Sequence, residues 1–409
     1  MSKEACYRPK FMTYKQSMDI LNSLDIKNKN THKIFISDSL GYILAKDIIA
    51  DHNSPKYPTS GMDGYAIKHQ DLQLGILEIS DYNPAGTEIQ SEVVSSKCIK
   101  TFTGSLMPKG SDTLIPIENV TVKDEKIIIN ETVPFGFATR KVGENYEKDE
   151  VLIKAGTKIS FSEIGVMASL NIVQVDVFLK PTIAIASTGS EILDLGETQT
   201  NKAQIRSSNH ITLEAIAKKY GANVEQKGVV KDDKESILNL IKSSLLSSDI
   251  VVTTGGVSVG DYDFVKDIIK DEIGATVLFQ GVNIKPGQHI IIAQKENKFI
   301  VGLPGFAYSS TVTFLLYVLP LLFKLQGGNE SLKIINATIK DNFPKKTNKT
   351  VFTACNINLV NGNYEVDFKG KKNGTSAILT NMIGDNALLI QEEDVLDYKI
   401  DDTVKVLVI

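Results

Sequence analysis

The sequence predicts a multidomain α/β protein whose central domain is a doubly wound, parallel sheet. Between residues 181 and 327, short apolar runs alternate with segments of helical periodicity, which is typical of a parallel sheet with helices on both faces. Glycine and proline punctuate short strand-like runs between residues 56 and 140. Residues 331–409 alternate apolar and polar side chains, as a small β-barrel or sandwich does.

The length of 409 residues exceeds one ordinary hydrophobic core, and about 100–200 residues per domain gives two to four domains. The pattern favours four parts. These are an N-terminal helical domain (1–55 plus 141–180), an inserted β-rich domain (56–140), the central α/β domain (181–328) and the C-terminal β-domain (329–409).

The N-terminal part predicts two helices. Thr13 with Gln16 three residues later is a capping-box start. Apolar residues follow it at helical spacing: Met18, Leu21 and Leu24. Ser37 or Asp38 could cap a second short helix that runs through Ile49. A further helix is expected at 162–170.

In the inserted part we expect strands at 75–79, 98–103, 113–117 and 126–130. In the central part we expect strands at 183–187, 224–230, 249–254, 276–279 and 299–303, and helices at 209–220, 234–246, 262–271 and 306–325. Gly221 would end the first of these helices, and Asp232 with Glu235 could form a capping box at the second. Ligands of such sheets bind at the carboxyl ends of the strands.

Composition excludes several function classes. Lys plus Arg is 45 against 49 Asp plus Glu, a net charge of −4, so a broad basic surface for nucleic acid is not expected. The three cysteines are far apart in the sequence, which predicts neither disulfides nor a zinc site and fits a reducing compartment. The apolar stretch 312–325 is interrupted by Pro320 and predicts a buried helix. We therefore expect a soluble, cytoplasmic protein without a membrane partner.

Three glycine-containing turns follow strands of the central part, at 187–191, 253–263 and 302–305. Such turns let backbone N–H groups approach a ligand, and the N-terminus of the next helix favours anions. One glycine after a strand is more often only a turn. Three in one sheet converge on one edge, so they predict a site for an anionic ligand.

The second turn has the Gly255–Gly260 spacing of a P-loop, but Asp261 stands where the lysine is required. An ordinary nucleotide triphosphate site is therefore disfavoured. The nearby acids Glu191, Asp261 and Asp263 would repel a phosphate unless a Mg²⁺ ion lay between them. The equal alternative is that these acids are helix caps. Lys285, before a Pro-Gly turn, could offer a point charge to an oxyanion.

A serine hydrolase is the rival interpretation. Residues 256–260 match the G-x-S-x-G nucleophile elbow with Ser258 as nucleophile. His289 is the histidine that lies downstream, just past the next strand, which is an unusual place for the base. We therefore keep this as a remote alternative.

Outside the central part, 59–66 places two glycines around Asp63. Thr103–Ser105 and 140–145 are similar polar turns. With the central turns, these segments resemble the molybdopterin molybdenumtransferase family, which comprises MoeA and the E-domain of gephyrin. The matching stretches are SGMDGYA (60–66), TGSLMPKGSDTLIPIEN (103–119), RKVGEN (140–145), STGSE (187–191), TTGGVSVGDYD (253–263), IKPG (284–287) and GLPG (302–305).

The resemblance implies a helical dimerisation domain, a β-domain inserted in it, a MogA-like molybdopterin-binding α/β domain and a C-terminal β-barrel, assembled as a homodimer. It implies a reaction in which molybdate is inserted into the dithiolene of adenylylated molybdopterin with Mg²⁺ assistance and release of AMP. A MogA-like adenylyltransferase would supply that substrate.

The resemblance also implies roles for residues. Asp63, Glu191 and Asp263 would be catalytic, and Glu191, Asp232 and Asp263 would hold the metal. The expected substrate-binding residues are Thr103, Arg140, Thr188, Gly189, Gly255, Gly256, Ser258, Lys285, Pro304 and Gly305.

The chain departs from the family pattern at several positions. Ser190 and Asn145 replace aspartates, Gly281 replaces a basic residue, Gln288 and His289 replace Lys-Pro, and Phe306 and Ala307 replace Asn-Pro. Because acids and lysines are lost together, the net charge of the site could be kept. Alternatively, the chain is a non-catalytic paralogue that binds or scaffolds molybdopterin.

Overall fold

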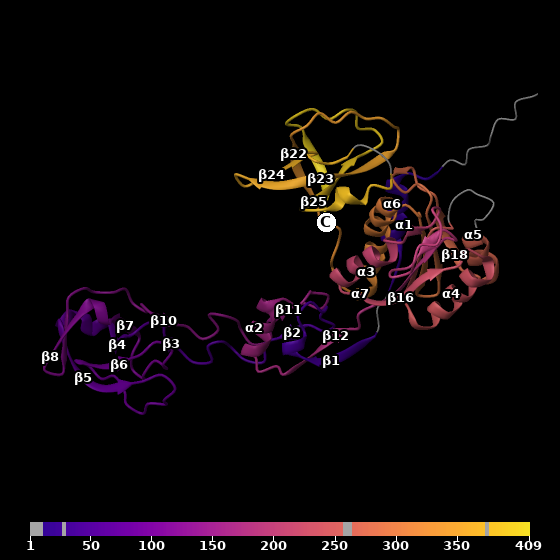
Figure 1. Cartoon of the computed structure of the whole chain (residues 1–409). Helices are drawn as coiled ribbons and strands as arrows, with labels where there is room; N and C mark the ends of the chain where they lie inside the picture. Colours follow the sequence, from indigo (N-terminus) through magenta and orange to yellow (C-terminus); the bar gives the residue numbers. More distant parts are fainter. Residues whose placement is uncertain (1–10, 27–29, 257–263, 373–375) are drawn as a thin grey trace, which may run out of the picture. The chain divides into compact units, whose positions relative to one another are not determined.

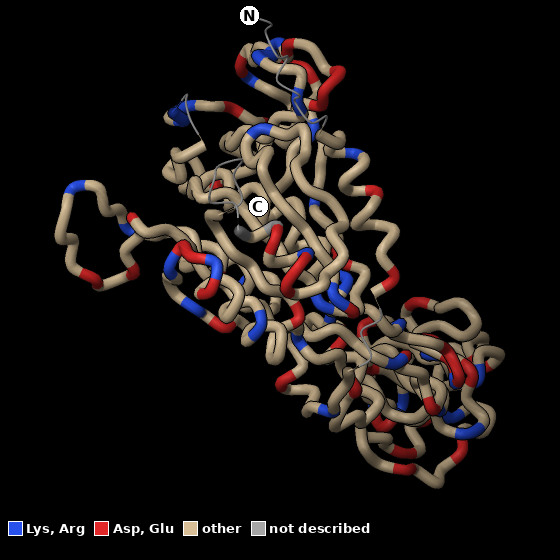
Figure 2. Tube along the Cα trace, turned by 90° about the vertical axis from the view of Figure 1, so that its right-hand side faces the viewer, with Lys and Arg blue, Asp and Glu red and all other residues tan. Residues whose placement is uncertain are grey.

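The structure is a computed structural model that describes residues 11–26, 30–256, 264–372 and 376–409 (Figure 1). The chain forms two compact units. The first comprises Met1–Ala45, Gly156–Ser160 and Gln174–Ile409, and the second comprises Lys46–Ala155 and Phe161–Val173. The division into four domains stays a prediction. Lys/Arg and Asp/Glu residues are interspersed along the described chain (Figure 2).

The first unit is built on a six-stranded sheet. In spatial order its strands are β16 (Asn223–Val230), β13 (Thr182–Thr188), β17 (Ile250–Thr254), β21 (Lys298–Leu303), β20 (Ile291–Lys295) and β18 (Thr276–Gln280). The first four are parallel, as predicted, while β20 and β18 are antiparallel. Strand β20 was not predicted, because its hairpin turn to β21 uses Glu296 with a positive φ instead of the Asn-Gly or Asp-Gly signal.

Helices cover both faces of this sheet, and alternate residues of β13 show how. Ile183 and Ile185 pack with Leu213 of α3 (Asn209–Lys219). Ala184, on the opposite face, packs with Ile237 of α4 (Lys234–Ser247). The fold class is therefore confirmed: a doubly wound α/β domain in a mixed α/β protein.

The helical segment after β21 comprises α6 (Ala307–Thr313), the π-helical η5 (Phe314–Val318) and α7 (Leu319–Gln326). It is long and apolar enough to cross a membrane, but 89% of its most apolar window is buried. The Tyr317 hydroxyl lies 3.0 Å from Ser17 Oγ of α1 (Tyr14–Ser23). It is therefore a core helix, as the sequence predicted.

Helix α1 begins with the predicted capping box between Thr13 and Gln16. Its Leu21 is buried in the core of the central sheet. The second helix predicted through Ile49 is wrong. Helix η1 (Ile36–Asp38) is a single 3₁₀ turn, and β2 (Ile48–Ile49) pairs with β11 (Val151–Ile153). Gly41 has φ +78°, a left-handed conformation that breaks a helix and that glycine adopts at little cost.

The second unit contains another six-stranded sheet, of order β7-β4-β6-β5-β9-β8. The four predicted runs form β5 (Ile76–Asn83), β6 (Lys97–Thr101), β7 (Thr113–Pro116) and β9 (Lys126–Ile129). They are joined by β4 (Gly64–Ile67) and β8 (Val120–Lys123). The expected helix at 162–170 is α2 (Phe161–Ser169).

The C-terminal strands form a closed β-barrel, as predicted. They are β22 (Ile334–Ile339), β23 (Thr350–Val360), β24 (Asn363–Asp367), β25 (Asn386–Gln391) and β26 (Thr403–Val408). The sheet closes because β23 pairs with both β24 and β25. The short strand β19 (Ile284–Lys285) of the central region pairs with β23.

Candidate functional site

The three predicted turns meet at the carboxyl ends of β13, β17 and β21. They line a cavity of about 630 Å³, here called the turn pocket. Lining residues from these turns are Thr188, Gly189, Glu191, Gly255, Gly256, Pro304 and Gly305. Asp232, after β16, and Asn209, the first residue of α3, also line it. The structure therefore brings these predicted site residues together, while Asp263 and Ser258 lie outside the described residues.

Backbone packing explains the glycines of the turn pocket. Gly255 has φ +97°, and a Cβ added there would lie 2.5 Å from the Thr188 carbonyl oxygen. At Gly305, an added Cβ would lie 3.8 Å from Gly255 Cα. The turns thus approach one another closely through backbone atoms, a packing that a side chain at position 255 would prevent.

Asp232 has an unusual position in the turn pocket. The N-cap of α4 is Asp233, whose carboxylate accepts a hydrogen bond from the Ser236 N–H at 2.8 Å, so the predicted cap at Asp232 is wrong. Asp232 Oδ1 is buried without a hydrogen-bond partner among the described residues. Burial first, and then the charges of Glu191 and Asp233, raise the pKa of Asp232.

Glu191 is the second acid of the turn pocket. A Cβ at Gly189 would lie 3.0 and 3.2 Å from its two carboxylate oxygens, so the carboxylate lies against the turn backbone. Two negative groups that repel each other, one with an unpartnered oxygen, provide hard donors for a cation. Among the described residues, no group of three or more His, Cys, Asp or Glu gathers to hold a metal.

Asn209, at the start of α3, holds two of the turns together. Its Nδ2 donates to the Gly305 carbonyl oxygen at 2.7 Å and to Thr254 Oγ1 at 3.3 Å. No motif in the sequence singles out this residue. Its position at the start of a helix after a strand was visible, but its contact with a turn 96 residues away was not.

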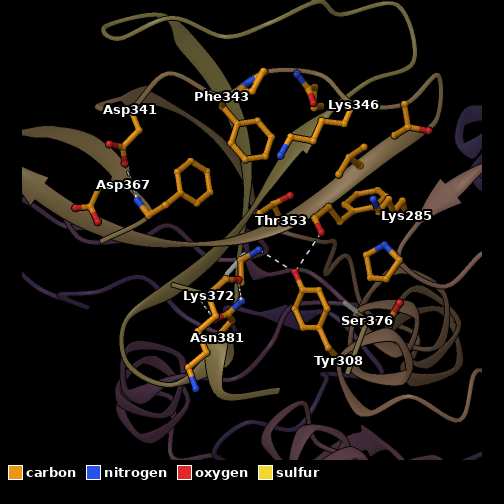
Figure 3. A pocket seen from close by; sticks show the side chains of 18 of the residues that line it. Lys285, Tyr308, Asp341, Phe343, Lys346, Thr353, Asp367, Lys372, Ser376 and Asn381 are labelled. Atoms are coloured by element: carbon orange, nitrogen blue, oxygen red, sulfur yellow. Dashed lines mark hydrogen bonds between the residues drawn. The ribbon is translucent and has the colours of Figure 1, made fainter. Parts of the chain in front are cut away.

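Lys285 lines a different and larger cavity of about 1160 Å³, here called the lysine pocket. Figure 3 shows Lys285 and Lys346 on one side of it and Asp341 and Asp367 on the other, with Lys372 below them beside Asn381. Tyr308 connects α6 to β23 in the wall of this pocket. Its hydroxyl donates to the Phe352 carbonyl oxygen at 3.1 Å and accepts from the Ala354 N–H at 2.8 Å.

Lys349 interacts with residues of both pockets, Lys285 of the lysine pocket and His289 of the turn pocket. Lys349, which the sequence analysis missed, donates a hydrogen bond to Gln288 Oε1. Burial and the nearby Lys285 lower the pKa of Lys349. Burial and Lys349 also lower the pKa of His289, which lines the turn pocket. Lys349 therefore brings an ammonium group to Gln288, where the family pattern has a lysine.

Two other departures also have local explanations. A Cβ at Gly281 would lie 2.3 Å from the ring of Phe11, and that ring meets His289 edge-on at a centroid distance of 5.7 Å. Phe11 thus occupies the space that a side chain at position 281 would need. Phe306 is 63% exposed and lines the turn pocket.

Three predicted site residues lie in the second unit. The backbone N–H and Oγ1 of Thr103 donate to Asp63 Oδ1 at 2.8 and 2.7 Å, and these bonds lower the pKa of Asp63. Arg140, opposite Thr59 in the β3–β10 pair (Thr59–Ser60 with Thr139–Arg140), forms an ion pair with Glu144 at 3.1 Å. The structure thus joins Asp63 to Thr103.

Comparisons with known proteins agree with this arrangement. Residues 12–171 match the MoeA N-terminal region (domain I and II), and residues 184–324 match a probable molybdopterin binding domain. A structure of the molybdopterin biosynthesis moeA protein from Pyrococcus horikoshii OT3 is similar, with a TM-score of 0.83, 27% identity and coverage of 98% of this chain and 100% of that one. The fold and its pocket thus define a protein of the MoeA class.

Curated relatives identify the family. A molybdopterin molybdenumtransferase from Staphylococcus epidermidis is 32% identical over 329 residues, covering 79% of this chain and 77% of the relative. One from Haemophilus influenzae is 31% identical over 302 residues, covering 73% and 74%. The chain belongs to the molybdopterin molybdenumtransferase family, and it is a transferase of molybdenum cofactor biosynthesis.

Proposed function

We propose that this transferase inserts molybdate into the dithiolene of adenylylated molybdopterin and releases AMP. The turn pocket carries the proposal, because it combines close backbone turns for a pyrophosphate with two acids, Glu191 and Asp232, at one sheet edge. Its volume of about 630 Å³ lies within the usual range of about 300–1,000 Å³ for small-molecule sites.

Each group of residues would make a different kind of contact with the substrate. The turn at Thr188–Gly189 and the one at Gly255–Gly256 would hold the pyrophosphate through backbone N–H groups, and the N-terminus of α3 adds a favourable dipole. Pro304 and Gly305 form the floor. Lys285 and Lys349 offer cations to the oxyanion substrate.

A Mg²⁺ cofactor fits the donors present, because Asp232 Oδ1 is buried and has no partner within the described part of the chain, and Glu191 is the next carboxylate. Mg²⁺ usually takes one or two carboxylates together with phosphate oxygens. Glu191 and Asp232 would hold it, and Asp263 is the third expected ligand. When bound, the ion would neutralise charge on the pyrophosphate.

The proposal includes an assembly. Asp63, Thr103 and Arg140 lie in the second unit, and we propose that they act on the substrate in a homodimer. A MogA-like adenylyltransferase is the proposed supplier of substrate, and the cytoplasm the proposed location. Comparing sedimentation of the chain with AMP release at several protein concentrations tests the dimer.

The decisive experiment is AMP release from adenylylated molybdopterin, with and without molybdate and Mg²⁺, by the wild type and Glu191→Gln. Release that requires molybdate and is lost in the variant would support the proposal. Glu235→Gln is the matched control, because Glu235 is exposed in the first turn of α4 and lines neither pocket. Tight binding of molybdopterin without AMP release by the wild type would refute the transfer and favour the scaffolding alternative.

A further inference from the structure

A buried histidine connects the turn pocket to an exposed carboxylate. His210 of α3 is 1% exposed, and its Nε2 lies 3.0 Å from Asp194 Oδ1. The Asp194 side chain is 35% exposed. On the other side of the ring, His210 Nδ1 lies 2.9 Å from Ser207 Oγ, and Ser207 lines the turn pocket.

The geometry fixes the roles along this chain. An ionised Asp194 carboxylate can only accept, so Nε2 carries the proton and Nδ1 is left as an acceptor. Ser207 Oγ lies 2.9 Å from Nδ1 and 2.9 Å from Ser187 Oγ, so its single proton can be donated to either atom. Ser187 Oγ lies 3.3 Å from the same Nδ1. A hydroxyl, an imidazole base and an orienting carboxylate in hydrogen-bond contact are the parts of a general-base unit.

Local folding positions this unit beside the pocket. The two-residue strands β14 (Ile192–Leu193) and β15 (Ile205–Arg206) run parallel, with Leu193 opposite Arg206. This pairing brings Asp194 and Ser207, the residues that follow each strand, to the same end. His210 is the second residue of α3, and its ring contacts both residues.

Two carboxylates of the described residues interact with His210, and the cation of Arg206 lies 3.5 Å from the Asp194 carbonyl oxygen. Asp194 lies on the β14 side, and Glu214 lies one turn further along α3. His210 contributes to lowering the pKa of Glu214, after the larger effects of hydrogen bonds from Lys218 and Gln226.

We propose that Ser207, His210 and Asp194 form a proton-transfer chain that serves as the general base for AMP release in the turn pocket. The inference rests on the proposed function. Water attacks a phosphorus of the phosphoanhydride, the new P–O bond forms, and the bridging P–O bond breaks with its electron pair on the departing phosphate. Ser207 Oγ accepts the water proton while its own proton passes to His210 Nδ1, and Asp194 stabilises the imidazolium and faces solvent.

The first test is the pH profile of AMP release. In the wild type the rate should fall at low pH, because His210 must be neutral to accept the proton. His210→Gln and Ser207→Ala should each lose about 100-fold in rate, the usual scale for a general base, and their remaining rate should lack the fall at low pH. Asp194→Asn, at a partly exposed side chain, should lose less and shift the profile to lower pH.

His52→Gln is the matched control. His52 also pairs with an aspartate, Asp51, but it lies in the second unit and lines neither pocket. Its rate and pH profile should equal those of the wild type. The thermal unfolding midpoint of each variant distinguishes loss of the proton-transfer chain from loss of the fold. A rate loss in His210→Gln with the wild-type pH profile retained would contradict the proposal.

A second readout does not depend on turnover. Nitrogen NMR of the His210 ring should show proton uptake as the pH falls, and inorganic pyrophosphate, used as the pocket probe, should move that uptake to higher pH. Ser207→Ala should weaken that response. If His210 stays neutral throughout, with and without pyrophosphate, the chain is structural and the proposal fails. If the ring responds but the wild type releases no AMP, the proton chain stands and the proposed transfer fails.

Discussion

The turn pocket and the lysine pocket differ in the groups that line them. The turn pocket is made of close backbone turns with two acids, whereas the larger lysine pocket has exposed side chains such as Lys346 and Lys372 around it. An exposed lysine is solvated, so another residue can take its position, whereas a glycine whose backbone contacts another turn cannot be replaced by a residue with a side chain. The difference teaches that the smaller cavity carries the sequence signal because its geometry constrains which residues can occupy it.

Replacing a glycine of the turn pocket should have the largest effect. Gly255→Ala adds a Cβ at 2.5 Å from a backbone oxygen in a positive-φ conformation. We expect a loss of about 3 kcal/mol in the free energy of unfolding, measured by urea denaturation. Gly196→Ala is the control, because Gly196 also has a positive φ (+87°) but open space around it, and it should lose about 1 kcal/mol. Equal losses would show that the close contact is unimportant.

Removing the unpartnered acid should reduce activity and not stability. Asp232→Asn should lower the AMP-release rate about 100-fold, on the scale of one lost electrostatic contact in a site. Because the pKa of Asp232 is raised in the fold, its ionised form destabilises the protein as the pH rises. The unfolding midpoint at neutral pH should therefore stay the same or increase. A lower unfolding midpoint with an unchanged AMP-release rate would show that Asp232 has no role in the site.

Substitutions of two lysines, Lys349 and Lys346, test which cation binds the oxyanion. Lys349→Ala should weaken binding of molybdate about tenfold, the scale of one charge-assisted contact, in equilibrium dialysis. Lys346→Ala, which removes an exposed lysine of the lysine pocket, should change it less than about twofold. The opposite ranking would place the oxyanion near Lys346 and away from Lys349.

The smallest effect concerns His289. Burial and Lys349 lower the pKa of its imidazole, so an NMR titration should show a midpoint below the ordinary value of about 6.5. Lys349→Ala should raise that midpoint. Because the folded-state pKa is lowered, the stability contributed by the neutral ring is present above about pH 6.5 and is lost as the pH falls. An unchanged midpoint in the variant would separate Lys349 from the turn pocket.

The sequence by itself determined the features that depend on neighbouring residues. The Thr13–Gln16 capping box, the parallel strands of the central sheet and the convergence of three glycine turns could all be predicted, because caps, periodicity and turn glycines act within a few positions. The sequence predicted a capping box at Asp232, but the N-cap of the helix is Asp233. Which of two neighbouring residues caps a helix depends on where the preceding strand ends.

The tertiary structure alone decided which distant side chains meet. Lys349 beside Gln288, Phe11 over Gly281 and the chain from Ser207 through His210 to Asp194 join residues on separate elements. No periodicity encodes such pairs, because each side chain is placed by the packing of its own element against a common core. Local chemistry therefore predicted that the three turns meet at one sheet edge, and three-dimensional packing decided which charges and proton acceptors surround them.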